Sequence, residues 1–232
     1  MITYTNEDCM VGMARYPDKH FDLAIVDPPY GIGECASRNN TGNRSTSKWK
    51  SPKGKTYKPF DDSVSYQEYQ YKELCRVSKH QIVFGANNFD FLPPSTGWIV
   101  WDKCVSENEH LSMCELAYSS FDIRCKKFTY LWAGFKREGN NSKKEIRYNH
   151  PTQKPVALYK WLLSNYAKPG DLILDTHVGS ASSLIACYDM GFDAVGFELD
   201  ADYYKASKQR LEDFMRQPRL EEVTEQWEQV TL

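Results

Sequence analysis

An apolar strand that leads into a carboxylate and two prolines, Leu23-Ala-Ile-Val-Asp-Pro-Pro-Tyr30, decides how this sequence is interpreted. Proline cannot donate a backbone hydrogen bond and its ring fixes φ, so the turn after the strand is rigid. The turn aims the Asp27 carboxylate and the Pro28 carbonyl at one place, and two acceptors suit an NH2 group. Tyr30 offers a flat face on which a planar base can stack. The plainer interpretation is a strand-ending turn, with Asp27 as a cap and Tyr30 in the core.

Short apolar runs of the same kind recur along the chain, with turn signals between them. Several are almost continuously apolar, which is typical of strands covered on both faces in a parallel or mixed α/β sheet. The predicted strands span residues 1–4, 23–26, 82–84, 98–101, 115–119, 128–132, 172–174 and 194–197.

Helical patterns separate some of these runs. An apolar stripe with spacings of 3, 4 and 3 residues extends from Val156 to Tyr166, and Lys168-Pro-Gly170 ends it. Two more helices are predicted around residues 184–188 and 204–215. Strands that alternate with helices predict an open three-layer α/β fold, in which ligands bind outside the carboxyl ends of the strands.

The composition bounds the class of protein. The chain has 232 residues, 41% of them hydrophobic, which suffices for one well-packed domain. A net charge of −2 excludes a uniformly basic nucleic-acid coat protein. The apolar runs are too short to span a bilayer and the N-terminus lacks a signal-peptide pattern, so we expect a cytoplasmic protein without membrane contact. Seven Cys and five His form no CxxC or HxxxH pair, so we expect reduced thiols and no metal site.

The nearly neutral total hides two basic loops. Residues 31–59 carry a net charge of +6 and residues 134–150 a net charge of +3, whereas residues 217–232 form an acidic tail with a net charge of −3. Basic loops suit a phosphate backbone, although a solvated linker explains such a loop equally well. The candidate nucleic-acid-binding residues are Arg38, Arg44, Lys48, Lys50, Lys53, Lys55, Lys58, Lys136, Arg137, Lys143 and Lys144.

A second group of motifs lies near the C-terminus. His150-Pro-Thr-Gln-Lys-Pro155 precedes a predicted helix, and Gly170-Asp-Leu-Ile-Leu-Asp175 leads into Thr176-His-Val-Gly-Ser-Ala-Ser-Ser183. This strand ends in a carboxylate and turns through a glycine into a helix, which lets backbone N–H groups approach a ligand. Glu198 ends the next strand, where an acidic residue accepts from a ribose diol. The loop lacks G-x-G-x-x-G, so a cofactor with a ribose and no phosphate fits better than a dinucleotide.

The two groups of motifs, in this order, resemble the beta class of amino-group (N6-adenine and N4-cytosine) DNA methyltransferases. The resemblance covers residues 1–215 and includes Asn6-Glu-Asp-Cys9, Trp98-Ile-Val-Trp-Asp-Lys103 and Cys114-Glu-Leu-Ala-Tyr118. It implies a single-domain, circularly permuted S-adenosylmethionine-dependent methyltransferase (Rossmann-like) sheet flanked by helices. The methyltransferase domain is then expected over residues 1–216, with the acidic C-terminal tail at 217–232.

The resemblance implies S-adenosyl-L-methionine as the cofactor. Thr176 and His177 stand where the family usually has Pro-Phe, and Ala181 replaces its last glycine, which puts the adenine pocket in question. The implied cofactor-binding residues are Asp8, Cys9, Asp27, Thr152, Lys154, Asp175, His177, Gly179, Ser180 and Glu198.

The implied function is site-specific methyl transfer to the N6 atom of a flipped-out adenine in double-stranded DNA, with Asp27, Pro28, Pro29 and Tyr30 as catalytic residues. Asp27 at the head of the motif favours adenine by resemblance alone, because adenine and cytosine both present an NH2 group. N4-cytosine and RNA therefore stay open as targets. A catalytically silent nucleic-acid-binding protein and a nicotinamide oxidoreductase stay open as functions. A homodimer stays open as well, since many relatives form dimers.

Overall fold

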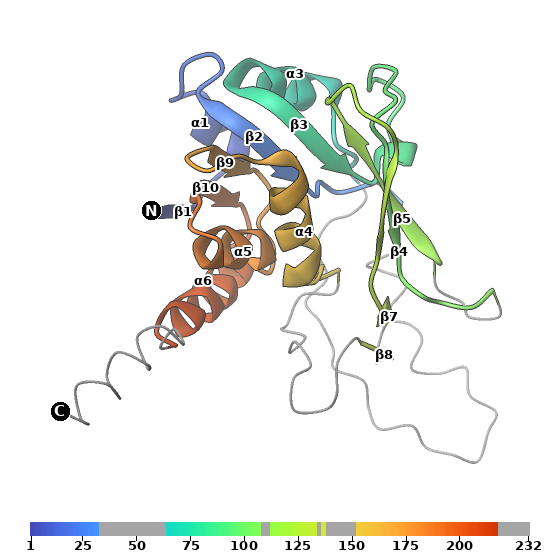
Figure 1. Cartoon of the computed structure of the whole chain (residues 1–232). Helices are drawn as coiled ribbons and strands as arrows, with labels where there is room; N and C mark the ends of the chain where they lie inside the picture. Colours follow the sequence, from blue (N-terminus) through green and yellow to red (C-terminus); the bar gives the residue numbers. More distant parts are fainter. Residues whose placement is uncertain (33–63, 108–111, 134–135, 138–151, 218–232) are drawn as a thin grey trace, which may run out of the picture.

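A computed structural model describes residues 1–32, 64–107, 112–133, 136–137 and 152–217. An eight-stranded mixed sheet forms its centre (Figure 1). Five neighbouring strands are parallel, and the last three follow an antiparallel step from β3 to β5. In spatial order the strands are β1 (Ile2–Asn6), β10 (Asp193–Glu198), β9 (Leu172–Asp175), β2 (Phe21–Val26), β3 (Ser78–Phe84), β5 (Cys114–Ser119), β4 (Ile99–Asp102) and β6 (Lys126–Thr129).

Helices cover both faces of the parallel part. On one face lie α4 (Val156–Tyr166), α5 (Ser182–Asp189) and α6 (Ala201–Met215). On the other face lie α1 (Cys9–Met13) and α3 (Glu68–Val77), while a short 3-10 turn, η2 (Ala86–Asn88), follows β3. The second sheet is a ribbon of β7 (Trp132–Ala133) and β8 (Lys136–Arg137). The three-layer α/β fold expected from the strand and helix patterns is confirmed.

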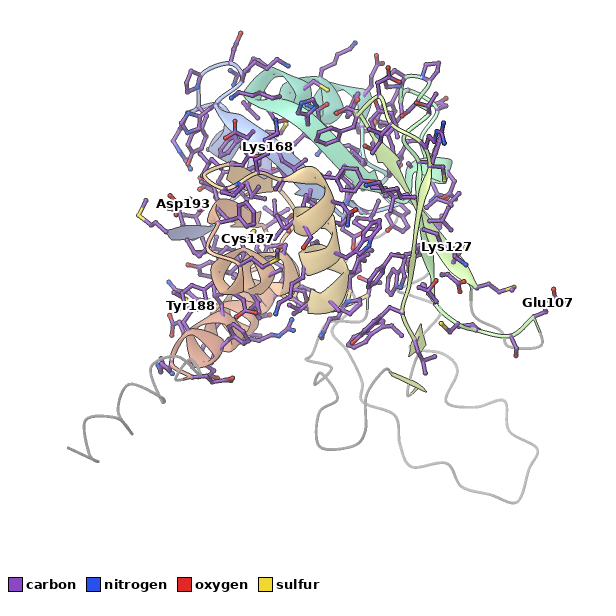
Figure 2. All side chains as sticks on the ribbon, viewed as in Figure 1. Glu107, Lys127, Lys168, Cys187, Tyr188 and Asp193 are labelled. Carbon is purple, nitrogen blue, oxygen red and sulfur yellow. The ribbon has the colours of Figure 1, made fainter. Side chains whose placement is uncertain are left out.

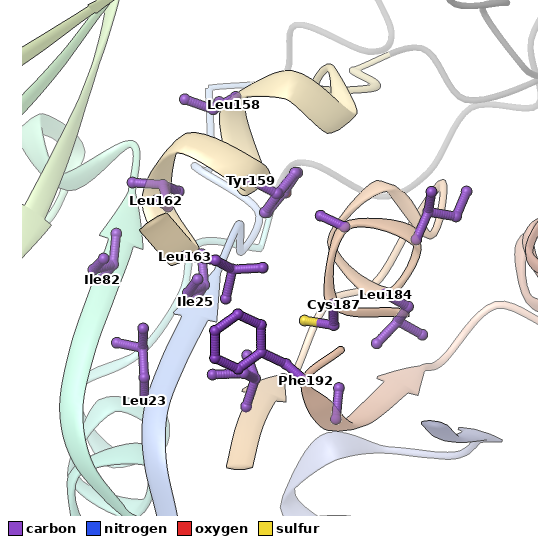
Figure 3. Packing of buried hydrophobic residues seen from close by; sticks show 14 of the residues in the cluster. Leu23, Ile25, Ile82, Leu158, Tyr159, Leu162, Leu163, Leu184, Cys187 and Phe192 are labelled. Carbon is purple, nitrogen blue, oxygen red and sulfur yellow. The ribbon is translucent and has the colours of Figure 1, made fainter. Parts of the chain in front are cut away.

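Strand β2 shows why the apolar runs are nearly continuous. Leu23 and Ile25 pack with α4 and α5 on one face, as Figure 3 shows. Ala24 and Val26 pack with α1 and α3 on the other face. Because both faces are covered, every position of the strand favours an apolar residue.

The chain reverses its direction of progress across the sheet between β9 and β2, which are neighbours. After β2 the chain passes through α3 to β3, and after β9 it passes through α5 to β10, on the opposite face and the opposite side. Such a reversal leaves a crevice at the carboxyl ends of the two strands, where open α/β sheets bind ligands. The sheet order therefore places the turn after β2 beside the turn after β9.

Two expectations need correction. The run at residues 128–132 was expected to form one strand, but the structure divides it into β6 and β7, because β6 stops pairing with β4 at Thr129 and β7 pairs with β8 instead. The helices α1 and α3 were not predicted. Helix α3 carries an apolar stripe of Tyr71, Leu74 and Val77, but it begins soon after the long polar segment 31–59, which hides the pattern.

Within the described ranges, no helix is long and apolar enough to cross a membrane. The same residues contain no group of His, Cys, Asp or Glu side chains that could hold a metal ion. The six cysteines in these ranges are free, as expected from their scattered positions. The acidic tail beyond residue 217 and nearly all of the two basic loops lie outside the described residues, so the domain boundary at 216 stays a prediction.

Candidate active site at the carboxyl ends of the strands

One edge of the parallel sheet gathers the acidic residues that the sequence singles out. Asp8 follows β1, Glu198 ends β10, Asp175 ends β9 and Asp27 follows β2, and these four strands are neighbours. The opposite edge carries other groups, including Lys168 and Asp193, labelled in Figure 2. The charges of Asp27 and Glu198 both raise the pKa of Asp175, so these three carboxyl groups lie near one another. The early and late motifs thus meet at one edge.

Asp175 fixes the loop that follows β9. One carboxylate oxygen accepts a hydrogen bond from the His177 backbone N–H at 2.9 Å, and the other accepts from the Ser183 hydroxyl at 2.5 Å. The carboxyl group is buried, and this burial raises its pKa to about 7. Since both oxygens bond to the loop and to the start of α5, the first role of Asp175 is to hold the loop in shape.

Two residues of the same loop have a backbone conformation that most residues with a side chain rarely adopt. Gly179 and Ala181 have φ values of 53° and 63°, in the left-handed region that favours glycine. Arg210 of α6 is buried beneath the loop and donates to the Ser180 carbonyl at 2.6 Å and to the Ser182 hydroxyl at 2.9 Å. This buried guanidinium, which the sequence did not indicate, supports the unusual conformation at Ala181.

Glu198 and Asp8 bind backbone N–H groups in the structure. The Glu198 carboxylate accepts from Gly179 N–H at 2.8 Å and from Asp200 N–H at 2.9 Å. Asp8 is exposed and caps α1 by accepting from Met10 N–H at 2.7 Å. A carboxylate has about four acceptor sites, so each group keeps capacity for a ligand hydroxyl. Burial raises the pKa of Glu198.

His177 and Cys9 lie at the same edge and are uncharged at neutral pH. Burial lowers the pKa of His177 to about 4 and raises the pKa of the Cys9 thiol to about 12. The His177 ring meets Tyr66 edge-to-face at 5.8 Å between ring centroids, and Tyr66 N–H donates to the Pro29 carbonyl at 3.0 Å. Tyr66, which sequence reasoning missed, therefore links the two turns. The sequence gives little indication of a role for Tyr66, because this residue comes soon after the long polar segment 31–59.

Side chains hold the Asp27 carboxylate. The Tyr30 hydroxyl donates to Oδ1 at 2.6 Å, and the Lys154 ammonium lies 2.5 Å from Oδ2. Among the described residues, no backbone N–H group donates to Asp27, so a capping role for Asp27 is not seen in that part of the chain. The Tyr30 ring packs against both core clusters and fits over Gly85, where an added Cβ would lie 2.1 Å from the ring. The proposed stacking of Tyr30 on a base stays a prediction.

The two carbonyls of the proline turn differ. The Pro29 carbonyl accepts from Tyr66 N–H, whereas the Pro28 carbonyl accepts no hydrogen bond from the described residues. Within that part of the chain, the Pro28 carbonyl thus keeps its acceptor capacity, and its contact with an NH2 group stays a prediction.

Lys154 reaches the site from the segment before α4. Its side chain is only 4% exposed, and it contacts Asp27, the Tyr30 hydroxyl at 3.1 Å and Glu115 at 3.1 Å. Its ammonium therefore lies at the proline turn, although the resemblance assigned Lys154 to the cofactor. Thr152, two residues earlier, is half-buried.

Glu115 is a site residue that sequence reasoning did not assign. It lies on β5, which is antiparallel to β3, so the start of β5 meets the carboxyl end of β3. Burial opposes its charge, but the attraction of Lys154 and Lys103 prevails and lowers the pKa of Glu115 to about 2. A lone carboxylate in the otherwise uncharged run 115–119 was the available signal.

Almost all of the predicted nucleic-acid-binding residues lie outside the described part of the chain. The backbone of Lys136 and Arg137 forms β8, paired with β7. The remaining candidates, Arg38, Arg44, Lys48, Lys50, Lys53, Lys55, Lys58, Lys143 and Lys144, lie outside the described residues.

Comparison with known proteins bears on this site. The pattern that defines the N6/N4 methyltransferase family, described as DNA methylase, matches residues 53–209. A putative methylase of Escherichia coli strain K12, YubD, is 25% identical over 98% of this chain and 97% of its own length.

Two solved structures are similar in fold. The M1.HpyAVI complex with S-adenosylmethionine has a TM-score of 0.56 and 18% identity, and the match covers 90% of this chain and 100% of that one. The cytosine-N4-specific PvuII DNA methyltransferase has a TM-score of 0.56 and 10% identity, over 92% and 90% of the two chains. The family pattern spans more than half of this chain. The chain therefore belongs to the N6/N4 DNA methylase family, whose members use S-adenosylmethionine.

Proposed function

We propose that this DNA amino-methyltransferase transfers the methyl group of S-adenosylmethionine to the N6 atom of an adenine flipped out of double-stranded DNA. One observation carries the proposal. The proline turn with Asp27 and the glycine turn with Gly179 follow neighbouring parallel strands at the reversal point of the sheet. Acceptors for an amine and a loop for a cofactor therefore lie at the same end of the sheet, where open α/β sheets bind ligands.

The proline turn supplies the chemistry at the amine. We propose that the Asp27 carboxylate and the Pro28 carbonyl each accept one N–H of the target NH2 group. These hydrogen bonds draw the nitrogen lone pair out of conjugation with the ring. Bound S-adenosylmethionine supplies an electrophilic methyl group on its sulfonium sulfur. The N–C bond forms as the C–S bond breaks, and the electron pair stays on sulfur.

Asp27 then stabilises the positive charge that the nitrogen acquires. Burial raises the pKa of Asp27, which suits it to take the proton that the methylated nitrogen releases. No covalent bond to the enzyme is needed. The raised pKa of the Cys9 thiol agrees with this, because it leaves that cysteine unreactive.

The glycine turn is suited to the cofactor. We propose that Glu198 accepts from the ribose diol, that Asp8 faces the adenine, and that His177 and Tyr66 line the adenine pocket with uncharged rings. The edge carries four carboxylates, Asp8, Glu198, Asp175 and Asp27, which would repel a pyrophosphate. This charge argues against the nicotinamide cofactor of an oxidoreductase. The basic segments 31–59 and 134–150 would hold the phosphate backbone.

The second candidate function is N4-cytosine methylation. The similarity in fold to the cytosine-N4-specific PvuII enzyme favours it, while the aspartate at the head of the motif favours adenine by resemblance. The proposed NH2 contacts suit both bases.

The test is transfer of labelled methyl groups from S-adenosylmethionine to double-stranded DNA, followed by enzymatic digestion and chromatography of the nucleosides. The expected product is N6-methyl-2′-deoxyadenosine. Label in N4-methylcytosine would replace the first function by the second. No label in DNA, with tight binding of S-adenosylmethionine, would favour a catalytically silent nucleic-acid-binding protein. Duplex RNA serves as the matched substrate control.

A further inference from the structure

The Lys154 ammonium lies deep in the site, close to two carboxylates and a hydroxyl group. Its nitrogen lies near three oxygens, namely Asp27 Oδ2 at 2.5 Å, Tyr30 Oη at 3.1 Å and Glu115 Oε2 at 3.1 Å. Tyr30 in turn donates to the second oxygen of Asp27. A buried cation in this position is strongly held, and it lies directly against the group proposed to receive the target amine.

That contact creates a difficulty for the proposed reaction. The target nitrogen becomes positive during methyl transfer, and a second positive charge beside Asp27 opposes this development. The ammonium also takes acceptor capacity at Asp27 Oδ2 that an incoming N–H needs. A full and exclusive Lys154–Asp27 ion pair would therefore weaken the stabilisation that Asp27 gives.

Glu115 offsets the Lys154 charge. It contacts the same ammonium from β5, and the Lys103 ammonium, whose side chain is 16% exposed, pairs with its other oxygen. Acidic and basic groups thus alternate along one row, from Asp27 through Lys154 and Glu115 to Lys103. Two carboxylates and two ammonium groups balance one another, so the row as a whole adds no charge to the site.

The two contacts of the ammonium are unequal. Lys154 is closer to Asp27 than to Glu115, and Glu115 Oε2 is buried without a hydrogen bond of good geometry in the described part of the chain. An unsatisfied buried carboxylate oxygen is costly, so Glu115 can take a larger share of the ammonium whenever Asp27 gains another donor. The incoming amine is such a donor.

We infer that Glu115 is a positioning residue that shares the Lys154 ammonium and thereby keeps the Asp27 carboxylate available to the target amine. The inference rests on the proposed function, because it assigns Asp27 to the amine. Glu115 itself touches neither substrate nor cofactor in this account.

The charged and titratable groups around Asp27 come from five segments: the turn after β2, β5, the segment before α4, α4 itself and β9. They are Lys154 before α4, Glu115 on β5, Asp175 on β9, and the Tyr30 and Tyr159 hydroxyls. Both tyrosines have raised pKa values and stay neutral, so Lys154 and the two carboxylates set the charge around Asp27. The negative charge of Glu115 raises the pKa of Asp27. Its removal should move the acid limb of kcat to lower pH.

The test is a double-mutant cycle with Glu115→Gln, Lys154→Gln and the double variant, measured as kcat for methyl transfer at saturating S-adenosylmethionine. Glu115→Gln should lower kcat by about 10- to 100-fold, the scale on which misplacement of a reacting group acts. It should leave the KM for S-adenosylmethionine unchanged. In the Lys154→Gln background the same substitution should change kcat by less than about twofold, because its effect passes through Lys154. Glu68→Gln, in an exposed pair with Lys72 on α3, is the matched control.

The inference would be overturned if the two substitutions lowered kcat independently, so that the double variant showed the product of the two single effects. An acid limb of kcat that does not move in Glu115→Gln would overturn it as well. If Glu115→Gln fails to fold, Glu115→Asp replaces it and should retain most of the activity, since the charge is kept. Carbon-13 NMR titration of the Asp27 carboxyl in the protein without DNA gives a readout independent of turnover. A lower Asp27 pKa in Glu115→Gln supports the inference and an unchanged pKa refutes it, even if no methyl transfer occurs and the proposed function fails.

Discussion

The two turns of the site hold their carboxylates in opposite ways. In the turn after β9, Asp175 and the neighbouring Glu198 accept mainly from backbone N–H groups, so these acids shape the loop itself. In the turn after β2, prolines fix the backbone, and Asp27 binds the side chains of Tyr30 and Lys154 instead. The rigid proline turn presents its carboxylate to side chains, whereas the glycine turn uses its carboxylates to support its own backbone.

The largest expected effect is at the rigid turn. Asp27→Ala removes the proposed acceptor of the amine, and the methyl-transfer rate should fall by about 100- to 1,000-fold, as on loss of one preorganised stabilising group. Labelled methyl transfer to DNA measures the rate, and circular dichroism checks the fold. The exposed Asp122→Asn serves as the control. A rate within tenfold of the unsubstituted chain would remove Asp27 from the reaction.

At the glycine turn, Glu198→Ala should weaken binding of S-adenosylmethionine by about 10- to 100-fold, the value of one hydrogen bond to a charged group. The change removes the acceptor of Gly179 N–H as well as the proposed ribose contact. Isothermal titration calorimetry measures the affinity. Glu212→Ala on the exposed side of α6 should bind as the unsubstituted chain does. Equal affinity in both variants would place Glu198 outside the cofactor site.

A smaller effect concerns pH. Burial raises the pKa of Asp175 from 3.8 to about 7. Between these values the folded chain keeps a proton that the unfolded chain has lost, so the free energy of unfolding falls as the pH rises from about 4 to 7. Asp175→Asn should flatten this dependence, which urea unfolding at several pH values measures. A slope equal to that of the unsubstituted chain would mean that Asp175 stays ionised throughout.

The smallest effect is expected at Ala181. Its left-handed backbone favours glycine, but its methyl group is fully buried in the core. Ala181→Gly relieves roughly 1 kcal/mol of backbone strain and loses about 0.8 kcal/mol of methyl burial. The two terms nearly cancel, so chemical denaturation should show a change below about 0.5 kcal/mol. A gain well above this value would show that the supporting contacts of Arg210 do not hold the loop.

Much of the fold was predictable because its signals are local. Residues 23–26 and 172–174 are apolar on both faces, and the stripe from Val156 to Tyr166 has helical spacing. Helix α3 was missed, because its stripe follows the long polar segment 31–59, although Gln67 and Gln70 form a capping box at its start. The break between β6 and β7 was missed too, because it depends on where pairing with β4 ends.

The site was predictable only where its residues sit at strand ends. Asp27, Asp175 and Glu198 each follow an apolar run, and parallel strands bring such ends to one edge. The Lys154–Glu115 contact was not predictable, since it joins residues 39 positions apart through an antiparallel step that the sequence does not reveal. The family resemblance identified the class of enzyme, and the match to the family pattern agrees with it.

The most direct test of the contrast is single-turnover methyl transfer to DNA as a function of S-adenosylmethionine concentration, with Glu198→Ala and Asp27→Ala side by side. If the glycine turn binds the cofactor and the proline turn acts on the amine, saturating cofactor should restore Glu198→Ala to near the unsubstituted rate and leave Asp27→Ala slow. Recovery of Asp27→Ala at high cofactor concentration, or a Glu198→Ala rate that stays low at saturation, would contradict this division of roles.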